Sequence, residues 1–226
     1  MHIGMIGGIG PAATEFYYRG LIARHAEAGT RLELTIVHAD VRELSQNLAN
    51  REAKKQAAIF ARLIERLKAA GARAAAITSM AGHFTVGELE PISPLPLINA
   101  LPAINAAVKE RKLRKVGILG TSTVMESRLY GAVDSVEFVL PEGADLEAVH
   151  TSYVDVARTA KVTEAQRQIF FRIGRNLCTA KGAEAVMLGG TDLFLAFEGH
   201  DPGFRVIDCA DLHVEAIYRT SIERVD

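Results

Sequence analysis

Two short polar turns carry the side chains best suited to acid/base chemistry, at residues 79–83 and 190–192. His83 lies four residues beyond Ser79 and could activate that hydroxyl, or act as a base itself with an unperturbed pKa near ~6.5. Asp192 in the second turn could reach a ligand directly or through a water. A structural alternative stays open for each, since His83 could cap or pack a short helix and Asp192 could be a helix N-cap.

The two turns belong to segments that repeat along the chain. Residues 2–7 are echoed by 115–120, and residues 71–79 by 182–190. A third echo, 96–99 against 205–208, follows at nearly the same offset. Repeated strand-plus-turn units predict a duplicated α/β lobe. Because parallel sheets bind ligands at the carboxyl ends of their strands, the two polar turns are expected to face each other across one cleft.

Alternating apolar strands and amphipathic helices predict parallel sheets. The expected fold is α/β, with two lobes related by a pseudo-twofold axis, parallel sheets flanked by helices, and an active-site cleft between the lobes. The first lobe is expected to comprise residues 1–98 and 208–226, and the second residues 99–207. Expected strands are 2–7, 32–38, 74–78, 97–98, 116–119, 137–139, 185–188 and 206–207, and expected helices include 12–28, 51–70, 101–111, 126–132, 163–181 and 210–222.

Composition narrows the class of protein. The 226 residues carry a formal net charge of −1 with scattered basic residues, which argues against a nucleic-acid partner. No apolar run reaches ~18 residues, so no membrane span is expected. A strand is expected almost at Met1, which leaves no room for a secretory signal, and the expected location is cytoplasmic. Cys178 and Cys209 lack metal-ligand spacing and are expected to be reduced thiols, with no metal site.

The first glycine-rich turn, residues 7–12, looks at first like a dinucleotide-binding turn. Pro11 stands where a helix would need free N–H groups, and the position about 20 residues on gives Glu27 inside an expected helix rather than a strand-end acid. A tight strand-to-helix turn is the better interpretation, and no cofactor is expected. Its backbone N–H groups would suit a substrate carboxylate.

Several motifs together resemble one family. Residues 6–14 resemble the opening motif of the cofactor-independent aspartate/glutamate racemases, and residues 120–127 resemble their second-lobe turn. Residues 189–193 resemble a third family motif, and residues 206–208 with His213 resemble the closing one. The resemblance runs along the whole chain in order. It implies two lobes with the site between them, and acid/base chemistry at a carbon next to a carboxylate.

This chain departs from the family pattern at two positions. Family racemases carry one cysteine in each opposed turn, so that one thiolate removes the α-proton and the other thiol returns a proton on the opposite face. Ser79 and Gly190 stand at those positions here. A serine hydroxyl is a weak base without a partner, and glycine has no side chain. Cys209, beside the end of the last expected strand, could be a relocated thiol or a small buried residue.

Candidate carboxylate-binding groups come from the same resemblance and from the turns themselves. Arg42 would suit bidentate carboxylate recognition or a surface ion pair with Glu43 or Glu52, and Lys161 would face the substrate side chain or solvent. Thr121 and Thr123 could donate hydroxyl hydrogen bonds. Backbone N–H groups of the glycine-rich turns complete the expected set, at Gly8, Met80, Ala81 and Thr191.

Three functions fit these observations. The first is an aspartate/glutamate racemase-like enzyme that works without pyridoxal phosphate. The second is a lyase, decarboxylase or isomerase of a small dicarboxylate on the same scaffold. The third is a carboxylate-binding homologue without catalysis. The expected partner is a small carboxylate or amino acid, and the expected assembly is a homodimer.

Overall fold

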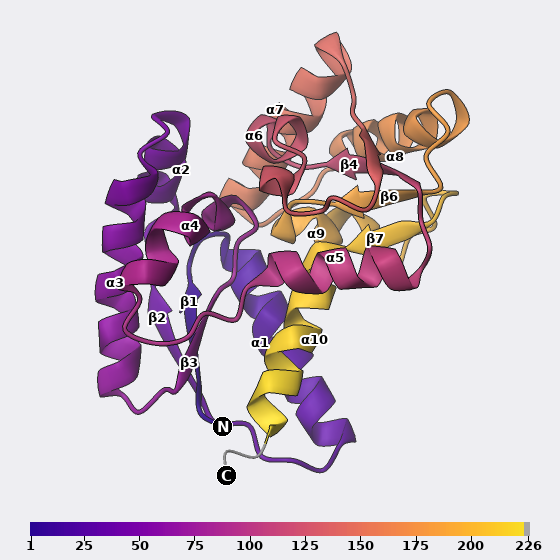
Figure 1. Cartoon of the computed structure of the whole chain (residues 1–226). Helices are drawn as coiled ribbons and strands as arrows, with labels where there is room; N and C mark the ends of the chain where they lie inside the picture. Colours follow the sequence, from indigo (N-terminus) through magenta and orange to yellow (C-terminus); the bar gives the residue numbers. More distant parts are fainter. Residues whose placement is uncertain (224–226) are drawn as a thin grey trace. The chain divides into compact units, whose positions relative to one another are not determined.

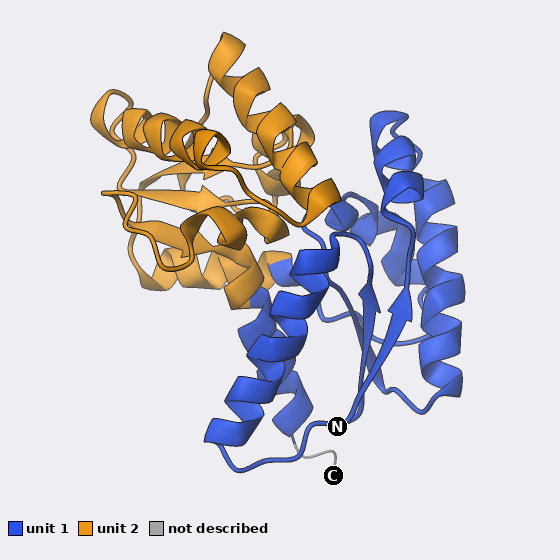
Figure 2. Cartoon of the chain, turned by 180° about the vertical axis from the view of Figure 1, so that it is seen from behind, with its two compact units in different colours: residues 1–100, 213–226 blue, residues 101–212 orange. Residues whose placement is uncertain are grey.

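The computed structural model describes residues 1–223, and the chain divides into two compact units. Unit 1 comprises Met1–Ala100 and the segment that begins at His213, and unit 2 comprises Leu101–Leu212. Figure 2 draws the two units in different colours. The sequence placed the corresponding boundaries after residues 98 and 207. None of the helices in residues 1–223 is long and apolar enough to cross a membrane.

Unit 1 is built on a three-stranded parallel sheet in the order β2-β1-β3. The central strand β1 pairs Gly7 with His38 of β2 and Ile6 with Ile77 of β3. All residues of β1 and β3 are buried, as expected for a strand covered on both faces. The strands are β1 (Ile3–Gly7), β2 (Leu34–His38) and β3 (Ala74–Ile77).

Helices cover both faces of this sheet, as Figure 1 shows, with α3 on one face and α1 and α10 on the other. The α3 face approaches closely, because a Cβ atom at Gly4 would lie 2.8 Å from Leu67 Cδ1. The helical elements of unit 1 are α1 (Pro11–Glu27), α2 (Val41–Ala49), α3 (Ala53–Ala69), η1 (Ala81–Thr85), α4 (Val86–Leu89) and η2 (Glu90–Ile92). Two further helices connect the units, α5 (Ala100–Glu110) and α10 (Cys209–Ile222).

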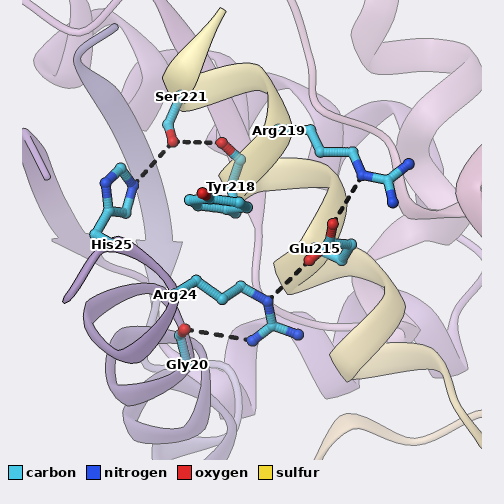
Figure 3. Close-up of polar contacts among 7 residues, drawn as sticks. All are labelled: Gly20, Arg24, His25, Glu215, Tyr218, Arg219 and Ser221. Atoms are coloured by element: carbon cyan, nitrogen blue, oxygen red, sulfur yellow. Dashed lines mark hydrogen bonds and ion pairs between the residues drawn. The ribbon is translucent and has the colours of Figure 1, made fainter. Parts of the chain in front are cut away.

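The last helix packs along α1 through polar contacts (Figure 3). Arg24 Nε lies 3.0 Å from Glu215 Oε2. His25 Nε2 lies 2.9 Å from Ser221 Oγ, and its ring meets that of Tyr218 edge to face at 5.1 Å. These contacts hold helix α10 against helix α1 within unit 1.

Unit 2 has a four-stranded parallel sheet in the order β5-β4-β6-β7. Strand β4 pairs Leu119 with Leu188 of β6, and Leu188 pairs with Asp208 of β7. Helix α8 packs against β4 and β6, where a Cβ atom at Gly117 would lie 3.0 Å from Leu177 Cδ1. The strands are β4 (Lys115–Leu119), β5 (Glu137–Val139), β6 (Ala185–Leu188) and β7 (Val206–Asp208).

The helices of unit 2 differ from the sequence prediction in two places. The prediction of a helix at 126–132 was wrong, because the helix already begins at Ser122. Thr121 is its N-cap, and the Thr121 side chain accepts a hydrogen bond from the N–H of Val124. The long helix α7 was not predicted. The helical elements of unit 2 are α6 (Ser122–Glu126), η3 (Leu129–Gly131), α7 (Gly143–Thr159), α8 (Glu164–Thr179), η4 (Thr191–Leu193) and α9 (Phe194–Phe197).

Candidate active site

Each sheet has one position where the strand order reverses. In unit 1 it lies between β1 and β3, and in unit 2 between β4 and β6. Open parallel sheets bind ligands outside the carboxyl ends of their strands at such positions. The polar turns singled out in the sequence follow these four strands. We therefore describe the strand-end turns of each unit separately.

The turn after β1 is held by a threonine. The Gly8 N–H donates to Thr14 Oγ1 at 2.8 Å, and the Thr14 hydroxyl donates to the Gly10 carbonyl at 3.0 Å. Gly8 has φ +86°, and a Cβ atom there would lie 2.3 Å from His38 Nδ1. The N–H of Gly8 therefore has an internal partner in this structure, whereas the sequence proposed it as a donor to a substrate carboxylate.

The turn after β3 brings Ser79 and His83 together, but not through the serine hydroxyl. His83 Nδ1 lies 2.7 Å from the Ser79 carbonyl oxygen, so this nitrogen carries the proton and donates. His83 Nε2 accepts from the Ala100 N–H at 3.3 Å. The hydroxyl of Ser79 instead accepts from the Gly82 N–H at 3.3 Å. Both ring nitrogens of His83 are thus engaged with the backbone.

A second buried histidine stacks edge to face on His83, with ring centroids 5.4 Å apart. His213 Nε2 donates to the Ile98 carbonyl at 2.8 Å, so its Nδ1 accepts from the Tyr17 hydroxyl at 3.0 Å. Burial lowers the pKa of His83 to about 4. Burial, with His83 as a neighbour, lowers the pKa of His213 to about 3. Both imidazoles are neutral at physiological pH, and the pair fixes the turn after β3 to α10.

The lowered pKa values predict acid sensitivity. In the unfolded chain both histidines titrate near ~6.5, so below that pH the unfolded state binds more protons than the folded state. Each neutral ring contributes its full stability above pH ~6.5, and this contribution is lost as the pH falls toward the pKa of the ring in the folded state. For His83 the loss is roughly 3 kcal/mol. Urea unfolding at pH 7, 6, 5 and 4 should show this loss. His213→Gln should flatten the pH dependence, and His200→Gln, at an exposed position, should leave it unchanged.

In unit 2, the turn after β4 begins α6. Thr121 is buried, and its Oγ1 accepts from the Val124 N–H at 3.2 Å. The Ser122 N–H donates to Nδ1 of His150, on α7, at 3.1 Å. Thr123 is half-buried on the first turn of α6. The hydroxyl of Thr121, proposed from the sequence as a donor to substrate, thus serves as a helix cap.

The turn after β6 packs against Tyr153 of α7. The backbone of Gly190 is extended, but a Cβ atom there would lie 2.3 Å from Tyr153 Cε2 and 2.4 Å from its Cζ. Glycine is required here by the tyrosine ring and not by the backbone conformation. The side chains of Thr191 and Asp192 are buried beside it, with Thr191 Oγ1 3.4 Å from Asp192 Oδ2.

Burial is the main cause that raises the pKa of Tyr153, and the charge of Asp192 adds to it. Hydrogen bonds from the Thr191 side chain and the Asp192 backbone act in the opposite direction. The phenol therefore stays protonated at neutral pH. Tyr153 and His150 were not predicted as site residues because helix α7 was not predicted. Their spacing of three residues places them on one face of this helix.

The remaining proposed residues lie in varied surroundings. Arg42 is exposed at the start of α2 and forms an ion pair at 3.1 Å with Asp40, not with the neighbouring glutamates that the sequence offered as partners. Lys161 is exposed after the end of α7. Met80 is fully buried, and Ala81 is half-buried where η1 begins.

The two thiols of the chain are poorly suited to base chemistry. Burial raises the pKa of Cys178, and burial together with the charge of Asp208 raises that of Cys209 well above its ordinary value. Cys209 is fully buried. Within residues 1–223, no group of three or more His, Cys, Asp or Glu side chains is arranged to hold a metal ion.

A model of the Asp/Glu/hydantoin racemase family matches residues 6–217. The chain belongs to this family, which confirms the resemblance seen in the sequence. A Yersinia pestis structure provisionally named an Asp/Glu racemase has 25% identity and a TM-score of 0.82, with 99% of this chain and 100% of that chain covered. An aspartate racemase homologue from Pyrococcus horikoshii has 24% identity and a TM-score of 0.80, with coverage of 98% and 99%.

Glutamate racemase from Francisella tularensis, solved with D-glutamate, has 15% identity and a TM-score of 0.69, with 97% of this chain and 80% of that chain covered. These similarities confirm the predicted fold class, α/β with two parallel sheets flanked by helices.

Proposed function

We propose that this chain binds a small acidic amino acid and moves a proton at the carbon next to its carboxylate. Family membership over residues 6–217 carries the proposal. The polar turns after β1, β3, β4 and β6 support it, because they lie where parallel sheets of this topology bind ligands. Aspartate and glutamate are the substrates named for the similar structures, and they are the ones we propose here.

The proposed chemistry does not use thiols. The resemblance places Ser79 and Gly190 at the family's cysteine positions, and the pKa values of Cys178 and Cys209 are both raised. A thiol with a raised pKa supplies little thiolate at neutral pH. Asp192, buried in the turn after β6, is the carboxylate that we propose as the base. To act as a base near neutral pH, an aspartate needs a pKa that burial has raised.

His83 enters this proposal as a positioning residue. Its two ring nitrogens bind the Ser79 carbonyl and the Ala100 N–H, and its pKa is lowered to about 4. A ring with this pKa is a weak base, so its contribution is to hold the turn after β3. His83→Ala should lower turnover at least tenfold, about 1.4 kcal/mol in barrier, and should also lower the melting temperature. Asp192→Asn should affect turnover without a comparable thermal change.

A one-base lyase or isomerase of a small dicarboxylate is the second candidate function. It is favoured by the Gly190–Tyr153 contact, which places a protonated phenol where a side chain at residue 190 would lie and leaves Asp192 as the one proposed base of this turn. Racemisation needs a proton acceptor on one face of the α-carbon and a donor on the other, whereas elimination needs one base. A homologue that only binds carboxylates would show neither reaction.

Proton exchange separates these functions. The purified protein is incubated in D2O with D- and L-aspartate and D- and L-glutamate, and the α-proton is followed by NMR. Racemase-type chemistry predicts deuterium at the α-carbon together with the opposite enantiomer. A new unsaturated or decarboxylated product would support the second function. If the α-proton of all four amino acids is unchanged while binding is retained, the result would support a homologue that binds carboxylates without catalysis.

A further inference from the structure

Helix α7 contacts both strand-end turns of unit 2. His150 and Tyr153, one turn apart on this helix, meet the turn after β4 and the turn after β6 respectively. These two strands flank the position where the strand order reverses. One helix face therefore brings two polar rings to the place where a sheet of this topology binds its ligand.

Tyr153 occupies the space that a side chain at residue 190 would fill. A Cβ atom at Gly190 would lie within 2.9 Å of three atoms of the ring, Cε2, Cζ and Cδ2. Real Cβ atoms essentially never approach so closely, so glycine and tyrosine form a matched pair. The phenol group thus extends from the position where the side chain of residue 190 would begin.

Both rings can donate hydrogen bonds. Burial keeps the phenol of Tyr153 protonated at neutral pH, so this group can donate a hydrogen bond. His150 Nδ1 accepts from the Ser122 N–H, so the N–H of this ring lies at Nε2. A protonated phenol and an imidazole N–H are suitable partners for a carboxylate oxygen.

We propose that His150 and Tyr153 are the carboxylate-binding donor pair of unit 2, with Tyr153 in place of a side chain at residue 190. This inference rests on the proposed function for the class of ligand, a small acidic amino acid or dicarboxylate. It assigns the two rings to ligand binding and not to proton abstraction, because a phenol that stays protonated cannot act as a base.

Ligand binding tests the pair. Isothermal titration with D- and L-aspartate, D- and L-glutamate and succinate is compared for wild type, Tyr153→Phe and the control Tyr18→Phe, which removes the same hydroxyl at an exposed position. We expect Tyr153→Phe to weaken binding about tenfold, the size of a lost hydrogen bond to a charged group, and Tyr18→Phe to change nothing. His150→Ala should weaken binding similarly, with His200→Ala as its exposed control.

Stability tests the matched pair independently of any ligand. Gly190→Ala should lower the melting temperature in the wild-type background and lower it much less in the Tyr153→Ala background, where the ring no longer occupies the space. Equal effects in both backgrounds would overturn the geometry. Unchanged affinity in Tyr153→Phe, or no binding of any ligand of the panel, would overturn the proposed donor pair. Binding without α-proton exchange would contradict the proposed function alone.

Discussion

Replacing Gly8 with alanine is expected to destabilise unit 1 by about 2–5 kcal/mol, which combines a left-handed backbone cost of about 1–2 kcal/mol with an overpacking cost of about 1–3 kcal/mol. Gly8 has φ +86°, and a Cβ atom would lie 2.6 Å from the Ala39 carbonyl oxygen. The backbone at Ala39 is fixed by its N–H, which donates to the Gly7 carbonyl at 2.8 Å. Unlike a flexible side chain, this carbonyl cannot move aside without breaking the β1–β2 pairing.

Two matched glycines separate the causes. Gly29 has φ +63° with nothing within 4 Å of a Cβ atom, so Gly29→Ala should cost only the backbone term. Gly82 lacks a left-handed φ, but its Cβ atom would lie 2.9 Å from Ile77 Cγ2, so Gly82→Ala should show the packing term. Urea unfolding of the three variants gives the comparison. If Gly8→Ala lowers the free energy of unfolding no more than Gly29→Ala does, the turn after β1 accommodates the added Cβ atom and the packing argument is wrong.

Asp192→Asn is expected to lower α-proton exchange at least tenfold, about 1.4 kcal/mol in the barrier. Asparagine keeps the size of the buried side chain but cannot accept a proton from carbon. The loss should therefore appear in kcat with a smaller change in KM. The measurement is the initial rate of deuterium incorporation into the amino acid that exchanges fastest with the wild-type protein.

Asp134→Asn is the control for this substitution. Asp134 belongs to the same unit, and its side chain is 76% exposed in an ion pair with Lys109. The control should keep the wild-type rate. If Asp192→Asn also keeps that rate, Asp192 is not the base, and the carboxyl of Asp208, whose pKa burial raises to about 6, becomes the next group to replace.

The sequence predicted the framework better than the contacts. Buried strands such as β1 and β6 are short apolar runs ended by glycine, so their positions follow from local composition. Helix α7 was missed because its hydrophobic periodicity is weak, and α2 because it is short. The fold class was predictable because the alternation of strands and helices depends on many residues at once.

The side-chain contacts of the candidate site could not be predicted from local sequence patterns. His83 and Ser79 are four residues apart, and the sequence suggested a contact between ring and hydroxyl. The ring instead binds the Ser79 carbonyl and stacks on His213, 130 residues away by number, a partner that only the fold could supply. Gly190 was noted as a missing side chain. That Tyr153 occupies its space depends on α7, which no local pattern had indicated.

Proton exchange by a cysteine-free variant tests the central claim most directly. Cys178→Ala/Cys209→Ala removes both thiols of the chain, and circular dichroism establishes that the variant is folded. Incubated in D2O with D- and L-aspartate and D- and L-glutamate, it is predicted to incorporate deuterium at the α-carbon at a rate close to that of the wild-type protein. Loss of exchange in the folded variant, or its absence in the wild-type protein, would contradict proton transfer without thiols.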